Sequence, residues 1–136
     1  MGKLSDEAKA LIGRPVLAWA TTVRPDGSLH GTVVWADVDG DEVIFNTAIG
    51  RAKERHLRAD ARVSVSVLDP DDAFHFVNVS GTARLETEGA DAVIDGLARK
   101  YLGLDAYPGR RPGERRINVR VSPEHVIYNR GPLRSG

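Results

Sequence analysis

The chain has 136 residues, enough for one domain with a hydrophobic core, and its 19 Lys and Arg balance its 19 Asp and Glu. This neutral balance argues against general nucleic-acid binding, which usually requires an excess of basic residues, although it leaves room for a local anion site. The sequence has no cysteine, which excludes disulfides, thiolate metal sites and a cysteine nucleophile and is compatible with a cytoplasmic protein.

The beginning of the chain contains no apolar segment typical of a signal peptide. No apolar run in the sequence is long enough to span a membrane. We found no internal repeat and no linker long enough to divide the chain. We therefore expect a single domain over residues 1–136, located in the cytoplasm and without a membrane anchor.

The first predicted element is a short helix capped by Ser5, with acidic residues in its first turn. Gly and Pro residues end this helix within residues 13–15. Residues 16–23 form a predicted strand, and the Arg-Pro-Asp-Gly sequence of residues 24–27 is typical of a tight turn. Residues 28–38 then form a second predicted strand, so that the two strands make a hairpin.

A third predicted strand, residues 42–47, runs into a turn of small residues and then into a short basic helix. The first N–H groups of a helix are unpaired, and the helix dipole places its positive end beside them. Arg51, Lys53 and Arg55 oppose this dipole unless an anion binds there. The conflict predicts an anion site, and the alternative is an ordinary solvated basic surface.

The second half of the chain continues with strands and one more helix. Val alternates with polar or small residues over residues 61–68, which predicts a strand with one buried face. Gly81, within the next strand, predicts a bulge or a close approach of another backbone. The remaining expected elements are a strand over residues 74–85, a helix capped by Thr87 and Glu88 with Ala92, Val93, Leu97, Ala98 and Tyr101 on its apolar stripe, a loop over residues 103–113, and strands over residues 117–121 and 126–128. Six or seven antiparallel strands with three inserted helices predict an α+β fold built on a closed or partly closed β-barrel.

The sequence contains few groups that could carry out chemistry. It has no Gly-rich phosphate loop, and its four His residues show no metal-ligand spacing. No Ser-His-Asp order with a nucleophile elbow is present, and the acidic residues cluster in turns and caps. We therefore expect no metal site and no catalytic side chain. An enzyme of this kind would take its chemistry from a cofactor.

Several segments together resemble one known family. The helix start Arg51-Ala52-Lys53 is followed by Asp60-Ala61-Arg62-Val63, and this pair of motifs is fairly specific. Further matching segments are residues 17–30, 32–35, 44–47 and 79–83. The sequence resembles the split-barrel superfamily of flavin- and deazaflavin-binding proteins, which includes pyridoxamine 5′-phosphate oxidase. Within it, the sequence is most similar to reductases that depend on coenzyme F420.

The resemblance implies a six-stranded antiparallel split β-barrel with short flanking helices, and a homodimer with cofactor sites at the subunit interface. It implies coenzyme F420 as cofactor, with FMN as the alternative. Arg51 and Lys53 would hold the cofactor phosphate, residues 32–35 would lie along the ring through their backbone, and the partner subunit would contribute from the strand over residues 74–85. The cofactor-binding residues implied in this way are Thr32, Val33, Val34, Trp35, Asn46, Thr47, Ala48, Arg51, Ala52, Lys53, Arg55, Phe76 and Asn78.

The function that the resemblance implies is hydride transfer from reduced F420 to an electron-poor conjugated small molecule such as an enone, a lactone or a quinone. Two alternatives stay open. One is an FMN-dependent enzyme similar to pyridoxamine phosphate oxidase, and the other is a carrier of flavin or haem without turnover. A barrel that binds oligonucleotides is disfavoured, because the net charge is neutral and exposed aromatic clusters for base stacking are lacking.

Overall fold

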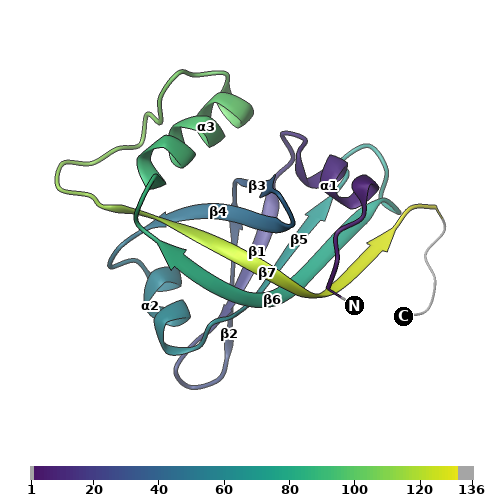
Figure 1. Ribbon diagram of the computed structural model, residues 1–136, viewed down its shortest axis with the longest axis horizontal. Coiled ribbons are helices and arrows are strands. Elements are labelled where there is room, and N and C mark those ends of the chain that lie inside the picture. The colour runs from purple at the N-terminus through teal and green to yellow at the C-terminus, as the bar shows by residue number, and fades with distance from the viewer. Residues whose placement is uncertain (1, 132–136) are drawn as a thin grey trace.

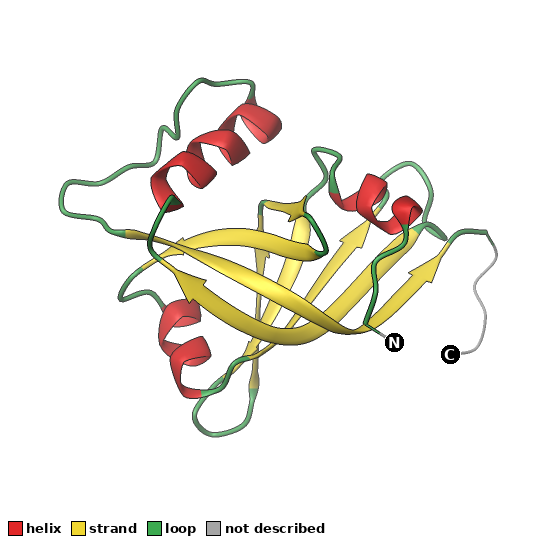
Figure 2. Ribbon diagram, in the orientation of Figure 1, coloured by secondary structure: helices red, strands yellow, loops and turns green. Residues whose placement is uncertain are grey.

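The computed structural model describes residues 2–131, and this part of the chain forms three helices around one antiparallel sheet of seven strands (Figures 1 and 2). The strands lie in the order β2-β1-β5-β6-β7-β4-β3. Their bounds are β1 (Ala18–Val23), β2 (Leu29–Val34), β3 (Ala36–Asp39), β4 (Glu42–Ala48), β5 (Arg62–Leu68), β6 (Phe76–Glu86) and β7 (Arg116–Asn129). The α+β barrel prediction is confirmed, with seven strands rather than the six of the family resemblance.

The sheet curls because its two edge strands are neighbours in sequence. β2 and β3 lie at opposite edges, but Trp35 alone separates them. The prediction of one strand over residues 28–38 is therefore wrong. The chain pairs with β1 up to Val34 and with β4 from Ala36 onward. The Tyr101 hydroxyl accepts a hydrogen bond from the N–H of Ala36 at 3.1 Å and satisfies the backbone at this crossover.

The core lies inside the curled sheet. β5 alternates between buried and more exposed residues, as its Val pattern predicts. The buried inward-facing side chains of the strands include Val43, Phe45, Val65, Val77, Val79, Val119 and Val121. Helix α1 (Asp6–Ile12) packs Leu11 and Ile12 against this core. No helix within residues 2–131 is long and apolar enough to cross a membrane.

Helix α3 (Ala90–Leu102) begins later than predicted. Its N-cap is Gly89, whose φ of 73° is left-handed, and neither Thr87 nor Glu88 caps it through a side chain. Leu97 and Ala98 are buried as predicted, together with Ala90 and Ile94, which the predicted stripe omitted. Ala92 is exposed, because the buried positions are spaced by four, three and one residues and Ala92 falls between them.

The bulge predicted at Gly81 is confirmed, and it also explains β7. The pairing shifts between Ser80 and Gly81, which face His125 and Pro123. A Cβ atom at Gly81 would lie 1.9 Å from the carbonyl oxygen of Ser122, so a larger residue does not fit. The prediction of two strands broken at residues 122–123 is wrong. β7 continues, because the bulge accommodates Pro123, which lacks an N–H for the ladder.

Candidate functional site

A pocket of about 260 Å³ opens where β2, β4, α2 and α3 meet. Its lining contains aromatic and aliphatic side chains together with three cations. The predicted residues in the lining are Val33, Val34, Trp35, Asn46, Thr47, Arg51 and Lys53, and those that sequence reasoning missed are Ile94, Leu97, Tyr107 and Arg116. The structure therefore brings segments from both halves of the chain into one site.

The cationic side is built on the start of helix α2 (Ala52–Ala59). Arg51 is the N-cap residue, has an extended backbone and makes no side-chain cap hydrogen bond. Lys53 lies in the first turn, and its Nζ donates to Thr32 Oγ1 of β2 at 3.0 Å. Burial lowers the pKa of Lys53, and the neighbouring charges of Arg51 and Arg116 lower it further. An anion bound here would relieve this repulsion.

Arg116, at the start of β7, supplies the third cation and is only 6% exposed. Its Nε donates to Asn46 Oδ1 at 2.8 Å, and its Nη1 donates to Glu114 Oε1 at 3.1 Å. The guanidinium also lies 5.1 Å from the centroid of the Tyr107 ring. The pair Arg115-Arg116 directly before a predicted strand was a signal that could have identified this residue.

The pocket lining also contains two aromatic residues, Trp35 and Tyr107. Trp35 stacks on Tyr101 with ring centroids 5.4 Å apart, and the Tyr107 ring stands edge-on to Trp35 at 6.0 Å. Asp95 of α3 accepts from the Tyr107 N–H at 2.9 Å and from Arg110 Nη2 at 2.7 Å. The loop between α3 and β7 is therefore fastened to α3, and it holds Tyr107 against the pocket. A flat conjugated ring would find both an apolar wall and nearby cations here.

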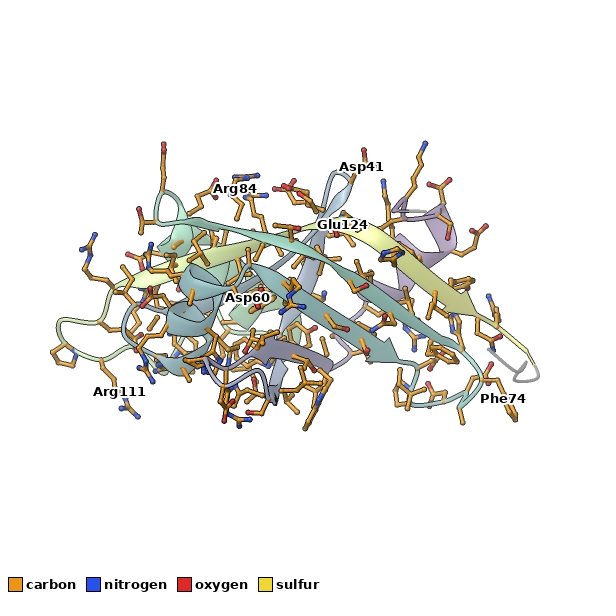
Figure 3. The ribbon with its side chains drawn as sticks, turned by 90° about the horizontal axis from the view of Figure 1, so that it is seen from below. Asp41, Asp60, Phe74, Arg84, Arg111 and Glu124 are labelled. Atoms are coloured by element: carbon orange, nitrogen blue, oxygen red, sulfur yellow. The ribbon has the colours of Figure 1, made fainter. Side chains whose placement is uncertain are left out.

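Two arginines of the loop between α3 and β7, Arg110 and Arg111, do not line the pocket. Arg111 points away from the barrel at one end of the molecule, whereas Phe74 lies at the other end (Figure 3). Arg110 is held by Asp95 and Asp91, with Nη1 of Arg110 3.1 Å from Asp91 Oδ1. Neither Arg110 nor Arg111 belongs to the pocket lining, whereas Arg116, the first residue of β7, does.

Some predicted residues lie beside the pocket rather than in it. The Thr32 hydroxyl accepts a hydrogen bond from Lys53, which lines the pocket. Ala48 is buried in β4. Ala52 begins α2, whereas exposed Arg55 donates a hydrogen bond back to the carbonyl oxygen of Gly50. These four residues surround the cationic side without lining it.

Phe76 and Asn78 do not contact the pocket of their own chain. Asn78 Nδ2 donates to the hydroxyls of Ser64 and Ser66, at 2.8 Å each. Phe76 lines a groove on the outer face of the sheet together with Trp19 and Val33. Their contribution to a partner subunit's site stays a prediction.

The pocket lining includes no histidine and no carboxylate. Within residues 2–131, no group of three or more His, Asp or Glu residues could hold a metal ion. Two of the histidines, His56 and His75, are buried and hydrogen-bonded to protein groups. His56 Nδ1 lies 2.8 Å from Thr22 Oγ1, and His75 lies between Asp69 and Tyr128 at 2.9 Å from each. The site is suited to binding and orienting a ligand.

Comparison with known proteins agrees with this description. Residues 4–129 match the family model described as pyridoxamine 5′-phosphate oxidase. An F420H(2)-dependent biliverdin reductase of Mycobacterium tuberculosis (strain CDC 1551 / Oshkosh) is 30% identical over 125 residues, covering 92% of this chain and 88% of that protein. A solved structure described as an F420 reductase is 26% identical with a TM-score of 0.79, covering 91% of this chain and 98% of the other. A conserved hypothetical protein of Mycobacterium tuberculosis, 20% identical with a TM-score of 0.70, shares the fold over 99% of this chain and 94% of its own.

Proposed function

The chain belongs to the pyridoxamine 5′-phosphate oxidase family and is an oxidoreductase of its F420-dependent branch, and we propose that it reduces an electron-poor conjugated small molecule. The observation that carries this proposal is the convergence of Arg51, Lys53 and Arg116 beside an aromatic wall. FMN is the alternative cofactor within the family.

The donor set fits the cofactor's phosphate. Three cations converge on the pocket from the start of α2 and from β7, and Glu114 pairs with two of them. An anion would balance the positive charge that remains. We assign the phosphate to Arg51, Lys53 and Arg116, beside the turn of Thr47 and Ala48. Reduced F420 supplies a hydride when it is bound.

The protein's own contribution is orientation and the exclusion of water. We expect the backbone of residues 32–35 to lie along the cofactor ring, with Ile94 and Leu97 forming the dry wall of the pocket. Holding a ring and an acceptor in contact is sufficient to make their reaction effectively unimolecular. We assign no side chain as an obligatory acid, because solvent can deliver the proton.

The acceptor that we propose is an enone, a lactone, a quinone or a comparable conjugated system. The biliverdin reductase relative, at 30% identity over 92% of the chain, favours a linear tetrapyrrole as a specific candidate. Turnover is tested by mixing reduced F420 and the protein with each acceptor and following the absorbance of the oxidised cofactor. Binding without turnover for every acceptor would favour a carrier instead.

Cofactor binding is tested by parallel titration with F420 and FMN, read from the fluorescence of Trp35, which lines the pocket. We expect the protein to prefer F420. Lys53→Ala should weaken F420 binding at least about tenfold, because it removes one of three converging charges. Lys9→Ala is the matched control, since Lys9 pairs with exposed Asp41 on the surface. An unchanged dissociation constant in Lys53→Ala would refute the assignment of the site.

We further propose that the protein is a homodimer formed through the outer face of the sheet. Trp19 of β1, Leu68 of β5 and Ile127 of β7 are between 51% and 58% exposed on this face. Val33 lines both the cofactor pocket and the groove on this face, so a second copy docked there would lie beside the pocket. Such docking agrees with the role predicted for Phe76 and Asn78.

The dimer is tested by light scattering on size-separated protein. Leu68→Glu should convert the dimer to a monomer, because it places a charge in the apolar face that the second copy would bury. Leu104→Glu is the control, since Leu104 is 45% exposed outside this face. A wild-type monomer at all concentrations would exclude the dimer. A cytoplasmic location is likewise a proposal, to be tested by fractionation of cells.

A further inference from the structure

One carboxylate lies among the cations of the site. Glu114, in the loop before β7, has a side chain that is only 10% exposed. Its Oε2 accepts from Arg51 Nη2 at 2.9 Å, and its Oε1 accepts from Arg116 Nη1 at 3.1 Å. Glu114 therefore bridges two of the three groups to which we assign the cofactor phosphate, and it offsets one of their three positive charges.

The two candidate cofactors present different charges at this position. The phosphate of FMN is a monoester, which carries a charge of about −1.5 to −2 at pH 7. The phosphate of F420 is a diester with a single negative charge. Because the repulsion between two charges grows with their product, a fixed carboxylate opposes the monoester almost twice as strongly as the diester. Low exposure of Glu114 keeps this repulsion from being screened by water and salt.

We propose that Glu114 is a specificity-determining residue, whose carboxylate between Arg51 and Arg116 disfavours a phosphomonoester relative to a phosphodiester and so shifts the preference from FMN toward F420. The inference rests on the proposed cofactor site. The three cations attract both FMN and F420, whereas repulsion by the Glu114 carboxylate discriminates between them.

The experiment measures dissociation constants of F420, FMN and riboflavin for the wild type and three variants. In Glu114→Gln, the FMN constant divided by the F420 constant should fall about tenfold, since the amide keeps an acceptor for the arginines but removes the charge. Glu114→Asp keeps the charge and should retain the wild-type ratio. Riboflavin, which lacks the phosphate, should bind the wild type and Glu114→Gln equally.

Asp41→Asn is the control, because Asp41 is an exposed carboxylate that pairs with Lys9 at 2.9 Å, at the turn between β3 and β4 (Figure 3). It removes the same charge and should leave the ratio unchanged. An unchanged ratio in folded Glu114→Gln would overturn the inference while F420 binding, and with it the proposed function, stands. Failure of the wild type to bind F420 would instead refute the proposed function.

Glu114→Gln removes a counter-charge from buried Arg116 and could therefore destabilise the protein. Thermal unfolding shows whether this variant is folded. If Glu114→Gln is not folded, the ratio of the FMN and F420 dissociation constants is measured in Arg115→Glu instead. Arg115 is exposed on the same loop, so its replacement adds negative charge next to Glu114 without disturbing the core. The ratio should then rise about threefold, and no rise would overturn the inference.

Discussion

The two shorter helices begin in opposite ways. At α1, Ser5 Oγ accepts a hydrogen bond from the Ala8 N–H at 3.1 Å, and Asp6 and Glu7 occupy the first turn. At α2, the N-cap residue is Arg51, which makes no side-chain cap hydrogen bond, and Lys53 lies in the first turn. The start of α1 agrees with the helix dipole, whereas the cations of α2 oppose it.

The difference between the two helix starts agrees with a structural role for α1 and with the ligand-binding role that we propose for α2. α1 packs its buried face on the core, and its Lys9 is neutralised at the surface by Asp41. The Lys53 ammonium of α2 instead donates to the neutral hydroxyl of Thr32, and burial lowers its pKa. A helix start that costs stability in the free protein agrees with the anion site that we propose there.

The largest effect on F420 binding is expected when the first residues of α2 are replaced by the residue types found at the start of α1. The double variant Arg51→Ser and Lys53→Glu should weaken F420 binding at least about a hundredfold, because two cations are lost and an anion is gained. The melting temperature should stay equal or rise, since Ser caps the helix and Glu agrees with its dipole. Titration measures the F420 affinity, and thermal unfolding measures the melting temperature. A variant that binds F420 as tightly as the wild type would refute the proposed anion site at the start of α2.

A smaller effect is expected from removing the cap of α1. Ser5→Ala should lower the free energy of unfolding by about 1 kcal/mol, because the Ala8 N–H loses its partner. Arg51→Ala, which removes no cap hydrogen bond, should lower it by less than about 0.5 kcal/mol. Denaturant unfolding measures both variants. Equal losses would mean that the two helix starts do not differ in stability.

The smallest effect concerns the acid of α2. Hydrogen bonds from the Gly50 N–H and from Arg58 lower the pKa of Glu54 below its ordinary value of 4.5. Because the folded state favours the carboxylate, its stabilisation is present above pH 4.5 and is lost as the pH falls below that value. Glu54→Gln should therefore be less stable than the wild type at pH 7 by under about 1 kcal/mol, with a smaller difference at low pH. Unfolding measured across this pH range would contradict the argument if the difference stayed constant.

Much of the fold could be predicted because it depends on residues close in sequence. The Ser5 cap, the turn at residues 24–27 and the Val alternation of β5 are local signals, and the structure confirms each of them. The division of residues 28–38 at Trp35 could not be predicted, because it depends on β2 and β3 pairing with different strands. The continuation of β7 past Pro123 likewise depends on a bulge in its pairing with β6.

The sequence by itself determined the cationic start of α2, because the conflict between Arg51, Lys53 and the helix dipole involves only neighbouring residues. Only the tertiary structure decided the charge balance of the pocket. Arg116 reaches Asn46 across 70 residues of sequence, and Glu114 reaches Arg51 across 63, through the pairing of β4 with β7. Such contacts depend on which strands become neighbours when the sheet closes, and no local pattern records that choice.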